Sequence, residues 1–258
     1  MASIAPPSPD SISASEFQDC LKTYPACLAA ISESKGAKPG QRSLVSLDEH
    51  RYGAALAAFG SESKGSSMSL EHVKVLVEWK LRHGKFRPTL MKLVSSNEPG
   101  FVMDQVQKAV KHYRDKADVP GALDILTQLK GIGPATASLL LAVHDPSKVI
   151  FFADEAFYWL CGGGTKVPIK YNKKEYTELN KRAQALAKRL GVKAVDIERV
   201  AFVLMRAPAE NTSANTASSP TGSPAETTRR KPPTKRKVAG DAPAVETPVR
   251  RSKRRKQA

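Results

Sequence analysis

Residues 129–160 read LKGIGPATASLLLAVHDPSKVIFFADEAFYWL, and the first half of this stretch predicts two helices joined by a tight turn. The preceding GALDILTQL predicts a short first helix. The Gly-Ile-Gly sequence at 131–133 suits the turn, because glycine tolerates a positive φ and a close approach of another backbone. Pro134 suits the first turn of the next helix, where its missing N–H costs no hydrogen bond. We therefore expect a helix–hairpin–helix over about residues 122–143, with Ile132 pointing inward.

This hairpin predicts an anion-binding site. The first backbone N–H groups of a helix have no partner within that helix, and they carry the positive end of its dipole. A helix start of this kind binds phosphate readily, so a DNA phosphate is the expected ligand. A purely structural turn between two helices is the alternative on these residues alone. The candidate DNA-binding residues of the hairpin are Lys130, Gly131, Ile132, Gly133, Ala135 and Thr136.

The second half of the stretch places two adjacent carboxylates, Asp154 and Glu155, inside the apolar sequence FFADEAFYWL. An ionised carboxylate in an apolar cleft can stabilise positive charge that develops on a sugar, or take a proton from water. The alternative is a helix start, in which Ala153 or Asp154 is the N-cap and Glu155 interacts with the helix dipole. Both interpretations stay open for Asp154, the candidate catalytic residue, whereas the helix start is favoured for Glu155.

The string L-x-G-I-G-P-A-T-A-S-L-L-L-A, followed by Asp154 in an apolar segment, resembles the helix–hairpin–helix–Gly/Pro–Asp superfamily of DNA glycosylases. The resemblance directly covers residues 122–160, and WKLRHGKFRPTL is similar to a eukaryotic subgroup of glycosylase-like proteins without a settled activity. It implies that the hairpin holds a phosphate and that Asp154 orients water or stabilises an oxocarbenium-like sugar. Bifunctional members have a lysine at the position of Ala135, so any glycosylase activity implied here is monofunctional, without lyase chemistry by that route.

Apolar stripes at helical spacing predict further helices on both sides of this stretch. Ser69 is the expected N-cap of one of them, and Asn172 and Glu175 have the spacing of a capping box at the start of another. VIFF at 149–152 is a candidate short strand that leads into a helix. The expected fold class is therefore all-α, a multi-helix DNA-glycosylase-like domain over residues 15–206.

The two ends of the chain differ in composition from this body. The first fourteen residues are rich in Ser, Pro and Ala and predict a disordered N-terminus. Residues 207–258 contain no Leu, Ile or aromatic residue, so they predict a disordered basic tail. Its clusters RRKPPTKRK and RRSKRRK predict nuclear localisation signals. Their basic residues are Arg229, Arg230, Lys231, Lys235, Arg236, Lys237, Arg250, Arg251, Lys253, Arg254, Arg255 and Lys256.

The charge balance favours a polyanionic partner. Lys and Arg number 41 against 25 Asp and Glu, which gives a net charge of +16. Both the body and the tail carry a positive excess, as nucleic-acid-binding proteins do. Within the body the densest basic patch is WKLRHGKFRP, whose cations are candidate phosphate contacts or partners of a helix dipole. These cations are Lys80, Arg82, Lys85 and Arg87.

Several classes of protein are not indicated. Neither a signal peptide nor an apolar run of membrane-spanning length is evident in the sequence. The three cysteines form no CxxC pair and the histidines form no metal-ligand spacing, so we expect no metal and no cofactor. We expect a nuclear monomer that binds DNA, in duplex form, and the nuclear import machinery, and that does not bind membranes.

Three functions are compatible with these patterns: a monofunctional DNA glycosylase, a non-enzymatic DNA-binding scaffold that retains the fold, and a protein-interaction module that reaches chromatin through its tail. A pocket in front of Asp154 beside the hairpin would favour the first function. An Asp154 side chain that caps a helix with both oxygens bonded would favour the second. A hairpin face that is neither basic nor exposed would favour the third.

Overall fold

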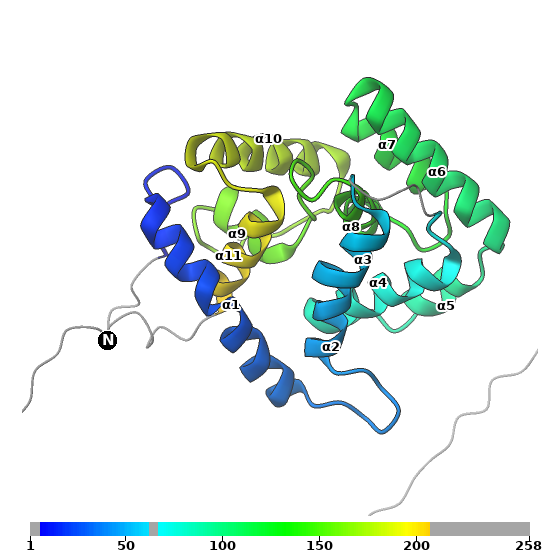
Figure 1. Cartoon of the computed structure of the whole chain (residues 1–258), viewed down its shortest axis with the longest axis horizontal. Helices are drawn as coiled ribbons and strands as arrows, with labels where there is room; N and C mark the ends of the chain where they lie inside the picture. The colour runs from blue at the N-terminus through cyan, green and yellow to red at the C-terminus, as the bar shows by residue number, and fades with distance from the viewer. Residues whose placement is uncertain (1–5, 62–66, 207–258) are drawn as a thin grey trace, which may run out of the picture. The chain divides into compact units, whose positions relative to one another are not determined.

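A computed structural model describes residues 6–61 and 67–206, and the predicted tail with its localisation signals lies outside this range (Figure 1). All regular elements of the described residues are helical, and none of these residues forms a strand, so the expectation of an all-α fold is confirmed. The elements are α1 (Ala14–Lys35), α2 (Leu44–Glu49), the π-helical turn η1 (His50–Ala54), α3 (Ala55–Phe59), α4 (Leu70–His83), α5 (Leu90–Ser95), α6 (Pro99–Lys116), α7 (Val119–Leu126), α8 (Pro134–His144), α9 (Asp154–Leu160), α10 (Lys173–Leu190) and α11 (Ala194–Arg206).

Helix α8 lies at the centre of the fold. Residues 135–144 are all buried, as expected for a helix that is apolar on every side. It contacts α3, α4, α6 and α7, and it also contacts α10. The helices α1, α9, α10 and α11 form a second group, in which α1 and α9 both pack on α11 (Figure 1). No helix among the described residues is long and apolar enough to cross a membrane.

Local capping signals set the helix boundaries. Ser69 is the N-cap of α4, as predicted. Asn172 caps α10 by accepting a hydrogen bond from the Glu175 N–H at 2.9 Å. The predicted capping box is nevertheless only half formed, because the Glu175 carboxylate accepts from the Lys170 N–H at 2.9 Å instead of the Asn172 N–H. Glu175 therefore fixes the loop that leads into α10.

Residues 6–13, which the sequence predicts to be disordered, instead pack on the helices. Ile12 is 1% exposed. The Trp159 indole N–H donates to the Pro7 carbonyl at 2.8 Å, and the Arg189 guanidinium donates to the Pro9 carbonyl at 2.7 Å. Composition did not reveal this packing, because main-chain carbonyls and one apolar side chain make these contacts.

The candidate strand at 149–152 is an extended segment without a strand partner. Side chains of α8, α10 and α11 satisfy its backbone groups, so the segment needs no sheet. The hydrogen bonds run from the Phe151 N–H to the Glu198 carboxylate (2.6 Å), from the Phe152 N–H to the Ser138 hydroxyl (2.9 Å) and from the Tyr176 hydroxyl to the Ile150 carbonyl (3.0 Å). These contacts fix the point at which the chain enters α9, directly before Asp154.

A buried ion pair supports this segment. The Glu198 and Arg51 side chains are 2% and 0% exposed, and their charged atoms lie 3.5 Å apart. The Tyr52 hydroxyl also donates to Glu198 at 3.2 Å. Burial raises the pKa of the Glu198 carboxyl, and the neighbouring Arg51 opposes this rise. Because no nitrogen of the Arg51 guanidinium has a hydrogen bond in the described residues, Glu198 is its charge partner.

Candidate functional site

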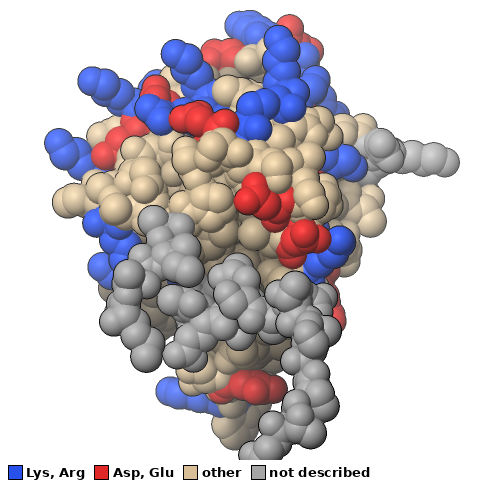
Figure 2. All heavy atoms as spheres, turned by 90° about the vertical axis from the view of Figure 1, so that its left-hand side faces the viewer, with Lys and Arg blue, Asp and Glu red and all other residues tan. Residues whose placement is uncertain are grey.

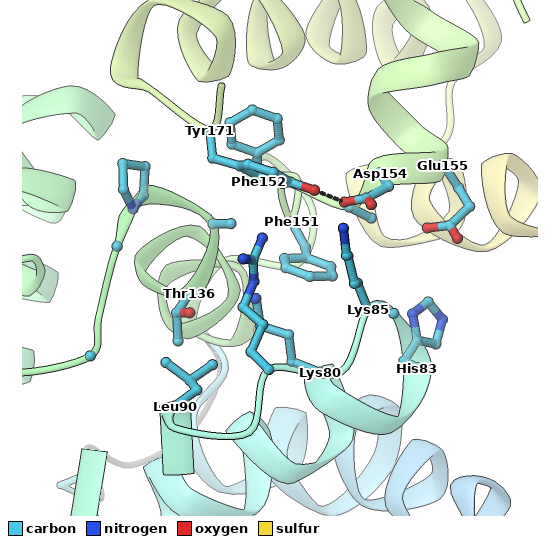
Figure 3. Close-up of a pocket in the computed structure, with 17 residues that line it drawn as sticks. Lys80, His83, Lys85, Leu90, Thr136, Phe151, Phe152, Asp154, Glu155 and Tyr171 are labelled. Carbon is cyan, nitrogen blue, oxygen red and sulfur yellow. Dashed lines mark hydrogen bonds between the residues drawn. The ribbon is translucent and has the colours of Figure 1, made fainter. Parts of the chain in front are cut away.

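A pocket of about 320 Å³ brings together motifs that are far apart in the sequence (Figure 3). Its wall consists of the end of α4 and the following loop, the turn before α8 with the first residues of that helix, the start of α9, and Tyr171. The volume lies within the range of about 300–1,000 Å³ that is typical of ligand sites. The predicted site residues that line it are Lys80, Lys85, Arg87, Gly131, Gly133, Ala135, Thr136 and Asp154.

The two glycines of the turn have different roles. Gly131 has φ +78°, and a Cβ there would lie 2.9 Å from the Cβ of Leu93. Glycine is therefore required at this position by both conformation and space. Gly133 has φ −94°, and a Cβ there would meet nothing within 4 Å. Ile132 is 4% exposed and packs into the core, as predicted.

The turn leaves backbone donors at the edge of the pocket. The N–H groups of Gly131, Gly133 and Ala135 donate no hydrogen bond within residues 6–61 and 67–206. Pro134 has no N–H, and the N–H of Thr136 donates to the Gly133 carbonyl at 2.9 Å. Three unpaired donors thus lie beside the positive end of the α8 dipole, which is an arrangement that can bind an anion.

Asn97 holds this turn in place, although no sequence pattern singled it out. Its side-chain carbonyl accepts from the Lys130 N–H at 2.8 Å, and its amide donates to the Lys130 carbonyl at 2.9 Å. The Lys130 side chain is exposed and does not line the pocket. Arg82 is also elsewhere, because its guanidinium donates to the Gly36 carbonyl and, at 3.2 Å, to Gln41. Of the predicted cations, Lys130 and Arg82 are therefore not brought to the pocket.

Asp154 is the first residue of α9, and its side chain does not cap the helix. One oxygen, Oδ1, accepts a hydrogen bond from the Tyr171 hydroxyl at 2.7 Å (Figure 3). The other oxygen has no hydrogen bond or ion pair among the residues that the structure describes. The carboxylate thus lies at the pocket wall, held by one oxygen, and the second is left for a ligand or for water.

Tyr171 is a site residue that sequence reasoning missed. The Arg87 guanidinium lies 5.4 Å from the centroid of its ring, and the ring of Phe152 lies 5.6 Å away on centroids. These contacts orient the hydroxyl that binds Asp154. The loop before α10 contains no pattern that marks Tyr171, since its role depends on residues brought close only by the fold.

Glu155, next to Asp154, has a different environment. Its side chain is 7% exposed and lies 2.5 Å from the Arg206 guanidinium. It is also in the first turn of α9, where an acidic side chain interacts favourably with the helix dipole. The favoured interpretation of Glu155 as a helix-start residue agrees with this position, and its charge is balanced by the last residue of α11.

Lys80 is the least expected member of the site. The sequence predicts a surface phosphate contact, but the side chain is half-buried and lines the pocket. The pKa of its amine is lowered to about 8, mainly by burial and then by the Arg87 guanidinium, while Asp154 acts in the opposite direction. The amine has no hydrogen bond and no ion pair in the described part of the chain. In Figure 3, Lys80 and Lys85 approach from the side opposite Asp154 and Tyr171.

The aromatic residues around Asp154 belong mainly to the core. Phe151 and Phe152 touch the pocket but are 4% and 1% exposed. Trp79 and Trp159 are each 0% exposed, so both rings fill the core. Phe86, in the loop between Lys85 and Arg87, is 68% exposed.

Basic side chains also cover part of the surface away from the pocket. Figure 2 shows Lys and Arg gathered near the top of one face, where α10 lies. The exposed cations of α10 are Lys173, Lys174, Lys181, Arg182, Lys188 and Arg189. Two of them are paired, Lys173 with Asp124 and Arg182 with Glu178, both at 2.6 Å.

Searches against models of protein families, curated proteins and solved structures find no match.

Proposed function

We propose that the protein binds duplex DNA in the nucleus, holds one extruded nucleotide in this pocket, and hydrolyses its glycosidic bond as a monofunctional N-glycosylase. One observation carries the proposal: unpaired backbone donors, free cations and a partly free carboxylate line the same pocket. An enzyme that acts on a base needs such a pocket beside a phosphate grip, because the target nucleotide must leave the stack.

The phosphate grip in this proposal is the turn before α8 together with the basic loop after α4. The N–H groups of Gly131, Gly133 and Ala135 bind one phosphate, and Lys85 and Arg87 bind its neighbours. Lys85 and Arg87 are exposed and have no ion pair within the described residues, so they are available to an anion. Contacts of this kind position DNA without reading its sequence.

The chemical step in this proposal belongs to Asp154. The Tyr171 hydroxyl holds Oδ1 at 2.7 Å, which fixes the plane of the carboxylate. The second oxygen then orients a water molecule toward the anomeric carbon of the nucleotide, or stabilises the positive charge that develops on the sugar. Ala135 lines the pocket in the place where the resemblance puts the lysine of bifunctional enzymes, so the water-dependent route is the one we propose.

The order of elements supports the same assignment. A short helix, a Gly-Ile-Gly turn and a helix that starts with proline are followed by an aspartate at the start of α9. We infer from this order that the chain is a member of the helix–hairpin–helix–Gly/Pro–Asp superfamily. The position of the Asp154 side chain also favours an enzyme over a non-enzymatic scaffold, since it lies at the pocket and does not cap a helix.

The experiment compares full-length wild type with Asp154→Asn on duplexes that carry uracil, alkylated, oxidised or mismatched bases, with hot alkali to cut at abasic sites. Asparagine retains an oxygen for the Tyr171 hydroxyl, so we expect DNA affinity to persist and excision to fall by about 100-fold or more. Asp145→Asn is the matched control, because the Tyr113 hydroxyl binds Asp145 at 2.8 Å outside the pocket. This control should excise at the wild-type rate.

Two results would contradict the proposal. Binding without excision on every duplex would leave a DNA-binding scaffold that has the fold but no chemistry. Unchanged duplex affinity in the Lys85→Met and Arg87→Met variants would show that the pocket rim is not the DNA contact. That second result would favour a protein-interaction module that reaches chromatin through residues 207–258.

A further inference from the structure

The pocket contains an amine that the hydrolytic mechanism does not use. Lys80 lies on α4, one turn before the helix ends, and its side chain lines the pocket instead of extending into solvent. Its Nζ has no hydrogen bond or ion pair with any described residue. A lysine that is half-buried without a partner is costly to the fold, so its position calls for a chemical explanation.

The surroundings of Lys80 favour the neutral amine. Burial is the largest influence that lowers its pKa, to about 8, and the Arg87 guanidinium is the next. Asp154, across the pocket on α9, favours the charged form. Lys85 is a further cation that lines the pocket. With a pKa of about 8, about one Lys80 in ten is neutral at pH 7, compared with about one in three thousand for a lysine of pKa 10.5.

A neutral lysine amine in a pocket is a nucleophile toward aldehydes, with which it forms imines. We propose that Lys80 forms an imine with C1′ of an abasic deoxyribose held in the pocket. The inference rests on the proposed function, because hydrolysis of the glycosidic bond leaves this aldehyde in front of Asp154. It extends that function beyond the monofunctional hydrolysis proposed above, because it adds a strand-cleaving step that the absence of a lysine at position 135 excludes only for the hairpin route.

The step balances without an oxidant or a reductant. The Lys80 nitrogen attacks the C1′ aldehyde, a C–N bond forms, and the oxygen leaves as water once it has taken two protons. Loss of a proton from C2′ then breaks the bond between C3′ and its oxygen, which leaves with the 3′ strand as a phosphate. Water hydrolyses the imine and returns the free amine of Lys80.

Lys85 provides a matched comparison on the same wall. It also lines the pocket, but its side chain is exposed on the loop after α4 and it has no comparable burial. If any lysine at the pocket could form the adduct, Lys85 would react at least as well as Lys80, because its side chain is more exposed.

The test is reduction with borohydride of the full-length protein mixed with a duplex that contains one abasic site, followed by peptide mass spectrometry. We expect a covalent protein–DNA adduct on Lys80 and not on Lys85, at least tenfold less of it with Lys80→Met, and a wild-type amount with Lys74→Met, whose amine pairs with Glu71 on the same helix outside the pocket. Peptide mapping of the wild-type adduct does not depend on how well any variant folds. Trapping should also increase by more than tenfold between pH 6 and pH 8, because the neutral fraction of the Lys80 amine rises from about one in a hundred to about one half.

A second arm uses 2-deoxyribose 5-phosphate in place of DNA. It distinguishes a protein that does not bind DNA from one whose Lys80 amine does not form an imine. If the duplex does not bind, the proposed function fails, and an adduct of the small aldehyde on Lys80 would still support the nucleophile. An adduct that persists in Lys80→Met would overturn the inference. So would a bound duplex without an adduct, or the absence of a Lys80 adduct in both arms.

Discussion

Replacing Lys80 with methionine should stabilise the folded protein at neutral pH, although it removes a residue from the proposed site. The folded structure holds the Lys80 amine at a pKa of about 8, compared with 10.5 for an ordinary lysine. This difference corresponds to about 3 kcal/mol, at about 1.4 kcal/mol per pKa unit. Solvent reaches part of the side chain, which reduces the expected gain to about 1–3 kcal/mol.

The stability advantage of Lys80→Met over the wild type should decrease as the pH rises. At pH 7 and below the amine is mostly protonated in both states, so the folded state bears nearly the full cost of the buried charge. Between pH 8 and 10.5 the unfolded chain binds more protons than the folded chain, so the free energy of unfolding of the wild type rises with pH. The advantage of Lys80→Met should therefore fall to about a quarter of its pH 7 value at pH 10.

The assay is urea unfolding at pH 7 and pH 10, followed by fluorescence of Trp79 and Trp159, which are both 0% exposed. Lys85→Met is the control, because its exposed side chain should leave the free energy of unfolding within about 0.5 kcal/mol of the wild type at both pH values. A gain for Lys80→Met that is equal at pH 7 and pH 10 would come from apolar packing alone. That outcome, or a loss of stability at pH 7, would refute the argument from a buried amine.

Two further predictions concern the turn and the buried ion pair. Gly131→Ala should lower the free energy of unfolding by about 1–3 kcal/mol, because of its positive φ and the contact with Leu93. Gly133→Ala should leave the free energy of unfolding unchanged, because its methyl group would project into open space. It should weaken DNA binding in a mobility-shift assay, since that space lies beside the phosphate grip. Equal losses of stability in Gly131→Ala and Gly133→Ala would contradict this distinction. Glu198→Gln should cost about 3–5 kcal/mol in a thermal or urea melt, because it leaves the Arg51 charge buried without a partner, and a loss below about 1 kcal/mol would show that the pair is not needed.

Much of the fold follows from local patterns. Ser69, Asn172 and Gly191 lie at helix ends because their side chains, or the lack of one, satisfy terminal backbone groups or allow a positive φ. Apolar residues at helical spacing predict the buried faces of α4, α6, α10 and α11, since a helix must bury one stripe. The turn at 131–133 and the helix that begins at Pro134 were also predictable, because the conformations of glycine and proline are set by their own covalent structure.

The candidate site was only partly predictable. The sequence identified Asp154 and the hairpin donors, because both are short motifs. It assigned Lys80 and Arg82 the same role, although one lines the pocket and the other binds main-chain and side-chain groups near Gly36. Tyr171 carried no signal, since a hydroxyl becomes a carboxylate partner only when another segment brings the carboxylate within reach.

The sequence by itself therefore determined the helices, their ends and the glycine turn, because each depends on interactions over a few neighbouring residues. Only the tertiary structure decided that α4, the turn before α8 and the start of α9 share one pocket. It also decided that Glu198 and Ser138 hold residues 149–153 extended, in place of a sheet. The pKa of Lys80 belongs to this second class, because burial and charge depend on all the groups that surround a side chain and not on its position in the chain.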